Sequence, residues 1–466
     1  MNKKRKWNTP HTYLILISII IIVYLISLVI PSGVYDRELN EATDRMAVVA
    51  DSYHQVEKVR LSPMDVFLAF PAGLERGATI IFFIIIASGT FQMINATGAI
   101  NVGVASLARI MRGKEILTIP VFVTVCSIGG ATIGMSEETL LFIPIGVVLA
   151  RSLGYDALVG MTMISLGALI GNTTAFMNPF SVGIAQEIAE LPLYSGIQAR
   201  LGFWAVYVIF TSAMLMRYAK KVKKDKRKSY VYDLEMSVQS ESLKLEELPR
   251  LSGRQRGVLL LLVGVMLCIV YGVFQWGWYL AELEAVFCML AIGAGIIGGF
   301  SPNKMCEEFI EGARNIVFGA LLIGFAQTII IVMENAQVID TVIYNLSNMI
   351  MWLPDTIAPL GMYLVQTIIN FFISSGSAQA MTTMPIMIPV ADIIGMTRQT
   401  AIVVYQFGDG ITNAIFPTAF VLMSGLSMTK IPYVKYLKFV APIIAAWIIF
   451  GAIFIMICDA VDFGPF

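Results

Sequence analysis

The sequence predicts an all-α membrane protein that crosses the bilayer several times and is built from two halves of inverted topology. Composition is the first indication: hydrophobic residues make up 57% of the chain and charged residues 14%, whereas soluble domains carry about 25% charged residues. Length is the second, because many apolar runs approach the roughly 20 residues that span a bilayer core as a helix. The third is a pair of polar patches rich in glycine or serine, residues 129–139 and 374–383, that interrupt apolar sequence.

The first predicted element is a retained transmembrane helix over residues 13–30. Its apolar run is too long for the core of a signal peptide, and no small-residue cleavage site follows it. The residues at positions 3–6 are all basic, which places the N-terminus in the cytoplasm by the positive-inside rule. Residues 32–62 are expected outside, because the part from Asp36 to Arg60 holds six acidic and four basic residues.

Six further apolar runs are predicted to form ordinary membrane helices. The loop between two of them, residues 217–256, holds twelve Lys and Arg against six Asp and Glu, so we expect it in the cytoplasm. We interpret this charge run as a topology marker and not as a nucleic-acid site. From this topology we expect the C-terminus on the outer side of the membrane. The six runs are residues 77–95, 199–219, 257–276, 279–299, 314–333 and 436–458.

Residues 116–151 and 356–394 are each expected to form a re-entrant hairpin. In both segments, two apolar arms of roughly 13 residues flank a polar patch, and at 1.5 Å per residue such arms are too short for two full crossings. A span broken in its middle by Gly, Asn and Pro follows each hairpin, at 155–182 and at 399–427. Polar backbone at membrane depth is tolerated only where it lines an enclosed site. A matched pair of such breaks indicates a secondary transporter.

The same order of hairpin and broken span in both halves predicts an inverted repeat, since the two copies enter the membrane from opposite sides. The expected units are a first repeat over residues 1–219, a cytoplasmic basic loop over 220–256, a linking span over 257–278 that inverts the second copy, and a second repeat over 279–466. The expected matches are Pro144 with Pro389, Asn172 with Asn413, Pro179 with Pro417, and Glu137 and Glu138 with Thr382 and Thr383.

The polar residues of the patches and breaks are the candidate substrate-binding groups. Helix breaks leave N–H and C=O groups unpaired, so that half-helix N-termini favour anions, whereas carbonyl and side-chain oxygens favour cations. The alternative is that small polar residues only let helices pack closely. The candidates are Ser136, Asn172, Thr173, Thr174 and Asn178 in the first half, and Ser375, Ser377, Gln379, Thr382, Thr412 and Asn413 in the second.

Three acidic residues lie in the same segments: Glu137 and Glu138 in the first patch and Asp409 in the second broken span. An ionisable group at membrane depth is costly and marks a functional site by default. Converging carboxylates suit a cationic ligand such as a guanidinium or ammonium group. Two alternatives stay open, a site for a coupling Na⁺ or H⁺ and a structural acid that is protonated or paired. The sequence does not rank Glu137 against Glu138.

Several function classes are excluded at this point. The chain has two histidines and five scattered cysteines without a CxxC pair, so no metal site or disulfide framework is indicated. It shows no nucleophile triad, phosphate-binding loop or zinc motif. We therefore expect no enzyme activity, no cofactor and no nucleic-acid partner.

The motifs Gly-Met-Ser-Glu-Glu-Thr at 134–139, Gly-Asn-Thr-Thr-Ala-Phe-Met-Asn-Pro at 171–179 and Asp-Gly-Ile-Thr-Asn at 409–413 resemble the YfcC branch of the anaerobic C4-dicarboxylate carrier family. The resemblance covers nearly the whole chain. It implies the ion-transporter superfamily, whose members are dimers with a scaffold domain and a mobile, elevator-type transport domain. Its sodium-coupled members carry Ser-Asn-Thr at such breaks, whereas this chain has Gly-Asn-Thr at 171–173 and Ile-Thr-Asn at 411–413.

The branch includes arginine–ornithine exchangers, and the acidic residues favour that substrate class over dicarboxylates. The expected protein is thus a homodimeric elevator-type antiporter of the bacterial cytoplasmic membrane. It would exchange basic amino acids, first of all arginine for ornithine. The alternative is a Na⁺- or H⁺-coupled carrier of C4-dicarboxylates or another small organic anion.

Overall fold

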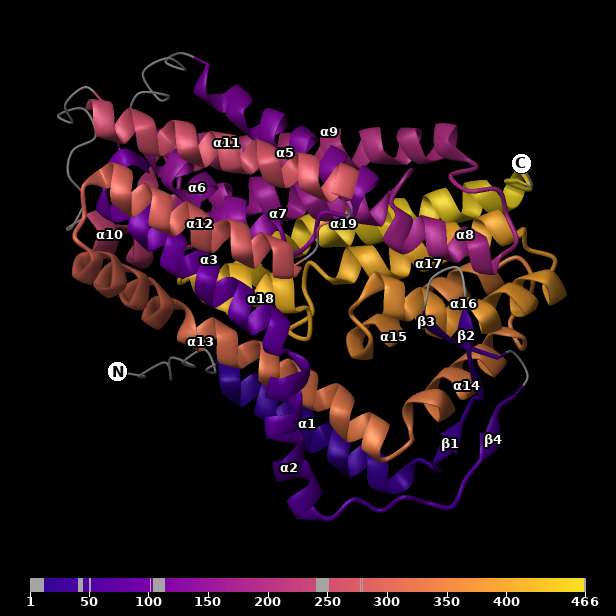
Figure 1. Ribbon diagram of the computed structural model, residues 1–466. Helices are drawn as coiled ribbons and strands as arrows, with labels where there is room; N and C mark the ends of the chain where they lie inside the picture. The colour runs from indigo at the N-terminus through magenta and orange to yellow at the C-terminus, as the bar shows by residue number, and fades with distance from the viewer. Residues whose placement is uncertain are drawn as a thin grey trace, which may run out of the picture.

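The structure, a computed structural model, describes residues 12–40, 45–49, 52–100, 102–103, 114–239, 251–276, 278 and 280–464. The basic residues at positions 3–6 and the part of the basic loop from 240 to 250 lie outside these residues. Helices dominate, and they run side by side in two groups (Figure 1).

The first group surrounds α13, the longest helix, which packs against α1, α2 and α3. Glycines allow the close approach: a Cβ on Gly73 would lie 2.6 Å from the carbonyl oxygen of Gly324, and one on Gly312 would lie 2.5 Å from that of Ser88. The group comprises α1 (Thr12–Val29), α2 (Pro63–Arg76), α3 (Ala78–Ala96), α11 (Gly253–Trp276), α12 (Leu280–Gly298) and α13 (Pro302–Asn335).

The second group contains both predicted hairpins and both predicted breaks. From the first half it takes a short 3-10 turn, η1 (Glu115–Leu117), with α5 (Thr118–Ile133), α6 (Thr139–Ser152), α7 (Ala157–Thr173), the π-helical turn η2 (Pro179–Gly183), α8 (Ile184–Ile188) and α9 (Ile197–Lys224). From the second half it takes α15 (Ala358–Phe372), α16 (Gly376–Ile393), α17 (Arg398–Thr412), α18 (Phe420–Met428) and α19 (Tyr433–Ala460).

The broken helices stand at the centre of this group. The arms α5 and α6 both pack on α7, and the arms α15 and α16 both pack on α17. The helix α7 ends at Thr173 and helical structure resumes at Pro179, while α17 ends at Thr412 and is followed by α18 from Phe420. Both breaks therefore lie where the sequence predicts them.

The first arm of the first hairpin is longer than predicted. Residues 115–132 alone are apolar and long enough to cross a membrane, whereas we expected an arm of roughly 13 residues. The reason is that Gly129 and Gly130, assigned to the polar patch, belong to α5. Gly130 allows close packing, since a Cβ there would collide with the carbonyl oxygen of Ala168 in α7.

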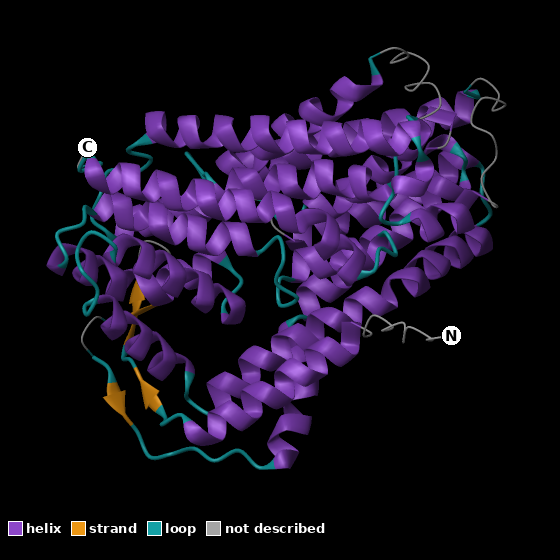
Figure 2. Cartoon of the chain, turned by 180° about the vertical axis from the view of Figure 1, so that it is seen from behind, coloured by secondary structure: helices purple, strands orange, loops and turns teal. Residues whose placement is uncertain are grey.

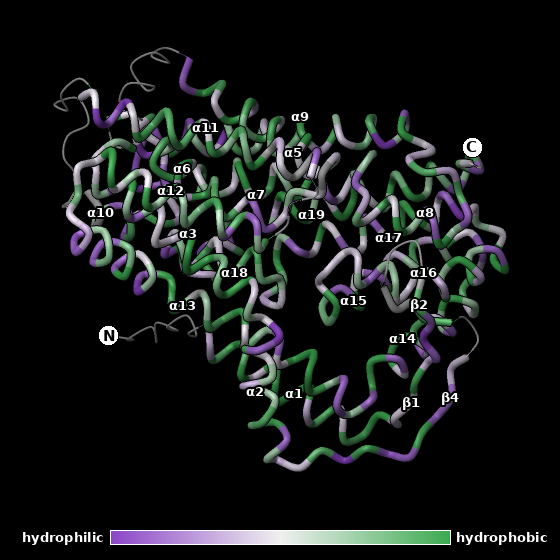
Figure 3. The backbone as a smooth tube through the Cα atoms, viewed as in Figure 1, coloured by the Kyte–Doolittle hydropathy of each residue, from purple (hydrophilic) through white to green (hydrophobic). Residues whose placement is uncertain are grey.

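Among the described residues, six helical segments are long and apolar enough to span a membrane: 78–96, 115–132, 197–224, 280–298, 302–335 and 433–460. Residues 13–29 form a shorter apolar helix. Hydrophobic residues line most of the long helices, and hydrophilic residues gather toward α10 and toward the strands near β4 (Figure 3). This distribution and the helix lengths fit an integral membrane protein.

The prediction of an all-α chain is wrong between residues 33 and 55, where the described residues include two small antiparallel strand pairs (Figure 2). Tertiary contacts support these short strands. The Gly33 amide donates to the carbonyl of Gln337 at 2.9 Å, and the Tyr53 ring stacks on Tyr344 of α14 (Ile339–Ile350) with centroids 4.0 Å apart. The pairs are β1 (Gly33–Val34) with β4 (His54–Gln55), and β2 (Arg37–Asn40) with β3 (Arg45–Val48).

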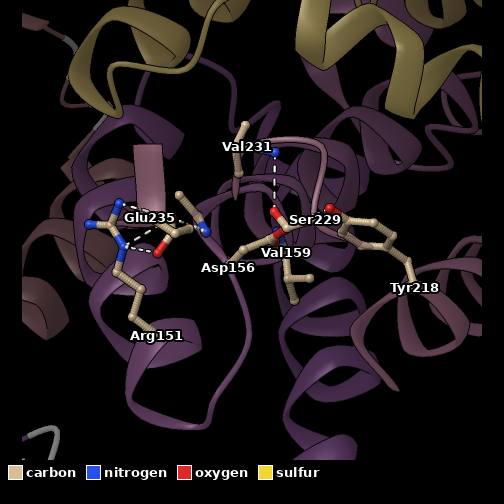
Figure 4. A network of polar contacts seen from close by, with 8 residues as sticks. Arg151, Asp156, Val159, Tyr218, Ser229, Val231 and Glu235 are labelled. Carbon is tan, nitrogen blue, oxygen red and sulfur yellow. Dashed lines mark hydrogen bonds and ion pairs between the residues drawn. The ribbon is translucent and has the colours of Figure 1, made fainter. Parts of the chain in front are cut away.

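The predicted basic loop is partly helical and fixed in place. A 3-10 turn, η3 (Lys226–Lys228), leads into α10 (Tyr232–Gln239). There, Glu235 accepts hydrogen bonds at 3.0, 3.1 and 3.3 Å from the Arg151 guanidinium (Figure 4). Asp156, the N-cap of α7, accepts from the hydroxyls of Tyr218 and Ser229, both at 2.6 Å. The loop thus folds onto the start of α7, at the end of the molecule opposite the strands (Figure 1).

The turns after α6 and α16 suggest a second way to match the halves. Gly154 and Gly395 both have positive φ, at 85° and 74°, and α7 and α17 begin directly after these turns. Aligning the halves at the two glycines pairs Pro144 with Pro385 and not with Pro389. It also pairs Glu138 with Gln379, whereas Asn172 still matches Asn413. Two prolines, Pro385 and Pro389, both lie inside α16, so that either of them can be matched with Pro144.

Candidate functional site

The broken helices cross at their broken ends. A Cβ on Gly410 of α17 would lie 2.6 Å from the Cα of Thr173, the last residue of α7. Only glycine allows two backbones to approach so closely. The contact brings the polar end of α7 next to the polar end of α17, which the sequence predicts only as separate features.

In the first half, the predicted asparagines hold the hairpin tip. The Asn172 amide donates to the carbonyl of Met135 at 3.0 Å. The Asn178 amide donates to the carbonyl of Gly130 at 3.1 Å and to the Oδ1 of Asn172 at 3.0 Å. Thr174 donates to the carbonyl of Ile170. These side chains satisfy backbone groups that the break and the tip would otherwise leave unpaired.

In the second half, two residues that the sequence analysis missed organise the break. The Asn370 amide donates to the carbonyl of Asp409 and to the Thr412 hydroxyl, both at 2.8 Å, and to the Asn413 side chain at 3.2 Å. The Gln366 amide donates to Thr383 at 3.1 Å and its Oε1 accepts from Gln379 at 2.7 Å. Both residues lie inside the apolar arm α15, where no sequence signal marks them.

A cavity of about 650 Å³ lies between the two helix groups. One wall comes from the hairpins and carries Glu137, Ser374, Ser375 and Thr382. The opposite wall comes from α2, α13, the start of α14 and the strand segment. Its charged residues, which the sequence analysis did not connect with a site, are Arg37, Arg76, Glu334 and Asp340.

The structure separates the three acidic candidates. Glu137 lines the cavity, and no salt bridge involves it among the described residues. Glu138 turns back on its own tip, where its Oε2 accepts from the Ser136 amide at 3.0 Å. Asp409 is 7% exposed and lies behind the start of α16: a Cβ on Gly376 would be 2.8 Å from its Oδ2, and the Asn413 amide donates to its Oδ1 at 3.3 Å.

The predicted site residues therefore fall into three sets. Glu137, Ser375 and Thr382 share the cavity wall. Gln379, Asp409, Thr412 and Asn413 form the polar layer around α17, and Ser377 contacts Ser375 at 3.4 Å. The remaining candidates, Ser136, Glu138, Asn172, Thr173, Thr174 and Asn178, belong to the first hairpin tip and its break. The described part of the chain holds no cluster of three or more His, Cys, Asp or Glu side chains placed to bind a metal ion.

The chain is similar in sequence to proteins of one carrier family. Residues 9–459 match the model of the family described as "DcuC: C4-dicarboxylate anaerobic carrier". The chain is 32% identical to the Escherichia coli protein named "Putative basic amino acid antiporter YfcC", over 97% of this chain and 95% of that protein. It is 29% identical to an uncharacterized protein of Haemophilus influenzae, over 98% of both chains.

Two transporters of known structure have low similarity to this chain. The YdaH transporter of Alcanivorax borkumensis is 15% identical with a TM-score of 0.40, covering 98% of this chain and 100% of that one. The antimetabolite efflux pump MtrF of Neisseria gonorrhoeae is also 15% identical with a TM-score of 0.40, covering 97% and 96%. On the family match and the relative from Escherichia coli, this chain belongs to the C4-dicarboxylate anaerobic carrier family of membrane transporters.

Proposed function

We propose that this protein is an antiporter that exchanges basic amino acids, arginine for ornithine, across the bacterial cytoplasmic membrane. The observation that carries the proposal is Glu137, a carboxylate on the wall of the cavity with no salt bridge to another described residue. A guanidinium or ammonium group would supply the missing partner through a charge-assisted hydrogen bond. The name of the relative from Escherichia coli supports the same substrate class.

The second end of an amino acid would bind at the start of α16. The N-cap of this helix, Ser375, makes no side-chain capping bond, and the first hydrogen bond into the helix runs from Gln379 to the Ser375 carbonyl. Amides at a helix N-terminus attract carboxylates. Ser375 and Glu137 line the same cavity, whose volume of about 650 Å³ is within the range typical of small-molecule sites.

The proposed transport motion moves the second helix group against the first, as an elevator. The cavity lies between these groups, and the matching order of α5–α7 and α15–α17 supports two inverted repeats. We propose the domain limits given by the sequence, with 1–219 and 279–466 as the repeats, 220–256 as the cytoplasmic loop and 257–278 as the linking span. The working unit would be a homodimer, with the N-terminus inside and the C-terminus outside.

Exchange, and not net uptake, follows from the charge of the site. Without substrate, the Glu137 carboxylate would have to cross the membrane interior uncompensated, which is costly. A cationic amino acid on either side removes that cost. The empty carrier should therefore reorient slowly, and loaded forms should interconvert readily.

Counterflow in proteoliposomes tests the proposed function. Internal ornithine is expected to drive uptake of labelled arginine at least about 10-fold above liposomes without internal amino acid, because return of the loaded carrier avoids an uncompensated charge. The family description names C4-dicarboxylates, so succinate with sodium and proton gradients is the competing condition. Gradient-driven succinate uptake without arginine counterflow would replace our proposal with that alternative.

Asp409→Asn is expected to reduce arginine exchange at least about 10-fold while leaving the protein folded. Asparagine is nearly isosteric, so the contact with Asn413 can persist, but one negative charge near the substrate is lost in a medium of low dielectric constant. Asp392→Asn is the matched control, since Asp392 forms an exposed ion pair with Arg398. Equal exchange rates in the two variants would remove Asp409 from the site.

A further inference from the structure

The cavity wall opposite Glu137 carries two ion pairs that differ in character. Asp340 is buried, with 5% of its side chain exposed. Its Oδ1 lies 2.7 Å from the Nη2 of Arg37, and its Oδ2 accepts from the Tyr35 amide at 3.0 Å. Both carboxylate oxygens are therefore occupied, and this pair ties the strand segment to the start of α14. Asp340 therefore has a structural role, and its carboxylate is not available to a ligand.

The second ion pair is exposed. Glu334 lies near the end of α13, and its Oε2 is 2.5 Å from the Nη1 of Arg76 at the end of α2. The two side chains are 44% and 41% exposed. This is the one contact of the Glu334 carboxylate among the described residues, and exposed pairs of this kind are weak and easily exchanged.

The backbone beneath this pair is rigid. Gly73, three residues before Arg76, packs so tightly on α13 that a Cβ there would lie 2.6 Å from the Gly324 carbonyl oxygen. Gln327, two turns before Glu334 on the same helix face, also lines the cavity, and its Oε1 is buried without a hydrogen-bond partner in the described structure. A closely packed wall thus presents a second carboxylate, that of Glu334, to the cavity.

We propose that Glu334 is an outer subsite for the cationic end of the substrate and that Arg76 is the built-in guanidinium that the substrate displaces. This inference rests on the proposed function. An amino acid with a cationic side chain can satisfy both members of the opened pair, because its cation binds Glu334 while its carboxylate binds the released Arg76. A simple amine would leave Arg76 without a partner, and a dicarboxylate would leave Glu334 without one. The outer subsite therefore selects cationic amino acids before they reach Glu137.

Glu334→Gln tests the outer subsite through the split between KM and kcat. Gly33, Val34 and Arg37 of the strand segment line the cavity, and the charge distribution predicts that this segment lies outside. In whole cells preloaded with ornithine, the KM for external arginine is expected to rise about 10-fold, because a charge-assisted hydrogen bond is replaced by a neutral one, while kcat stays within about twofold. Half-saturation by internal arginine in inverted vesicles should not change, since we propose that the outer subsite faces the outside alone.

Arg76 supplies the matched variants. Arg76→Gln frees Glu334 of its competitor and is expected to lower the KM for external agmatine, an amine without a carboxylate, while raising that for arginine. Arg76→Lys should restore both values toward those of the unmodified protein. Glu334→Asp keeps the charge and is the variant to use if Glu334→Gln does not reach the membrane. Its KM for external arginine should rise less than 10-fold.

The outcomes separate this inference from the proposed function. If the unmodified protein shows no counterflow of basic amino acids, the proposed function fails and the outer subsite fails with it. If the unmodified protein exchanges arginine but Glu334→Gln leaves the external KM unchanged, or raises the internal and external values equally, only the outer subsite is overturned.

Discussion

Glu137→Gln is expected to reduce arginine–ornithine counterflow about 100-fold or more without loss of folded protein. Among the acidic residues on the cavity wall, Glu334 and Asp340 already pair with arginines, whereas Glu137 forms no salt bridge with a described residue. Replacing its carboxylate by an amide leaves the substrate cation without a counter-charge in a desolvated site, a loss of about 2–5 kcal/mol for buried charge pairs. Labelled arginine uptake at fixed internal ornithine measures the effect.

Glu138→Gln is the matched control, one residue away and identical in chemistry. The Glu138 carboxylate accepts from the Ser136 amide within its own turn and does not line the cavity. An amide oxygen can accept the same bond, so exchange should stay within about threefold of the unmodified rate. The opposite result, with Glu138→Gln inactive and Glu137→Gln active, would show that Glu138, and not Glu137, faces the substrate at the tip of the first hairpin.

The hairpins and breaks could be predicted because their signal is local. Pro179 and the polar residues that precede it interrupt an otherwise apolar sequence, and the second half repeats the pattern up to Pro417. Asn370 could not be found in this way. It lies one position before two phenylalanines in an apolar arm, and its three hydrogen bonds to α17 exist only once α15 packs there.

The charged wall of the cavity was missed for a different reason. Arg37 lies in the segment that we used only to assign an outer side of the membrane, and Glu334 ends an apparently ordinary span. Their partners, Asp340 and Arg76, are about 300 and 260 residues away in sequence, and no short-range pattern links such residues. The strands could not be predicted for a similar reason. Pairs of two to four residues depend on contacts with α14, and such short strands carry little sequence pattern of their own.

Gly410→Ala is expected to destabilise the protein by about 1–3 kcal/mol or more and to abolish exchange. A Cβ at this position would lie 2.6 Å from the Cα of Thr173, and a backbone atom cannot rotate away as a flexible side-chain end can. Overpacking of this kind forces backbone shifts, here at the crossing of the two broken helices on which the polar layer around Asp409 depends. A lower thermal midpoint in detergent, followed by size-exclusion chromatography, measures the loss.

Gly202→Ala on α9 is the control for Gly410→Ala. It measures the general effect on stability of replacing a helical glycine by alanine, away from the crossing of the broken helices. Its Cβ would meet nothing within 4 Å, so the substitution should be neutral or slightly stabilising, because alanine loses less backbone entropy than glycine in a helix. Equal midpoints for the two variants would contradict a tight crossing. A difference confined to Gly410 would mean that the two breaks are held together by backbone contact, as the proposed elevator motion requires of a site that moves as one body.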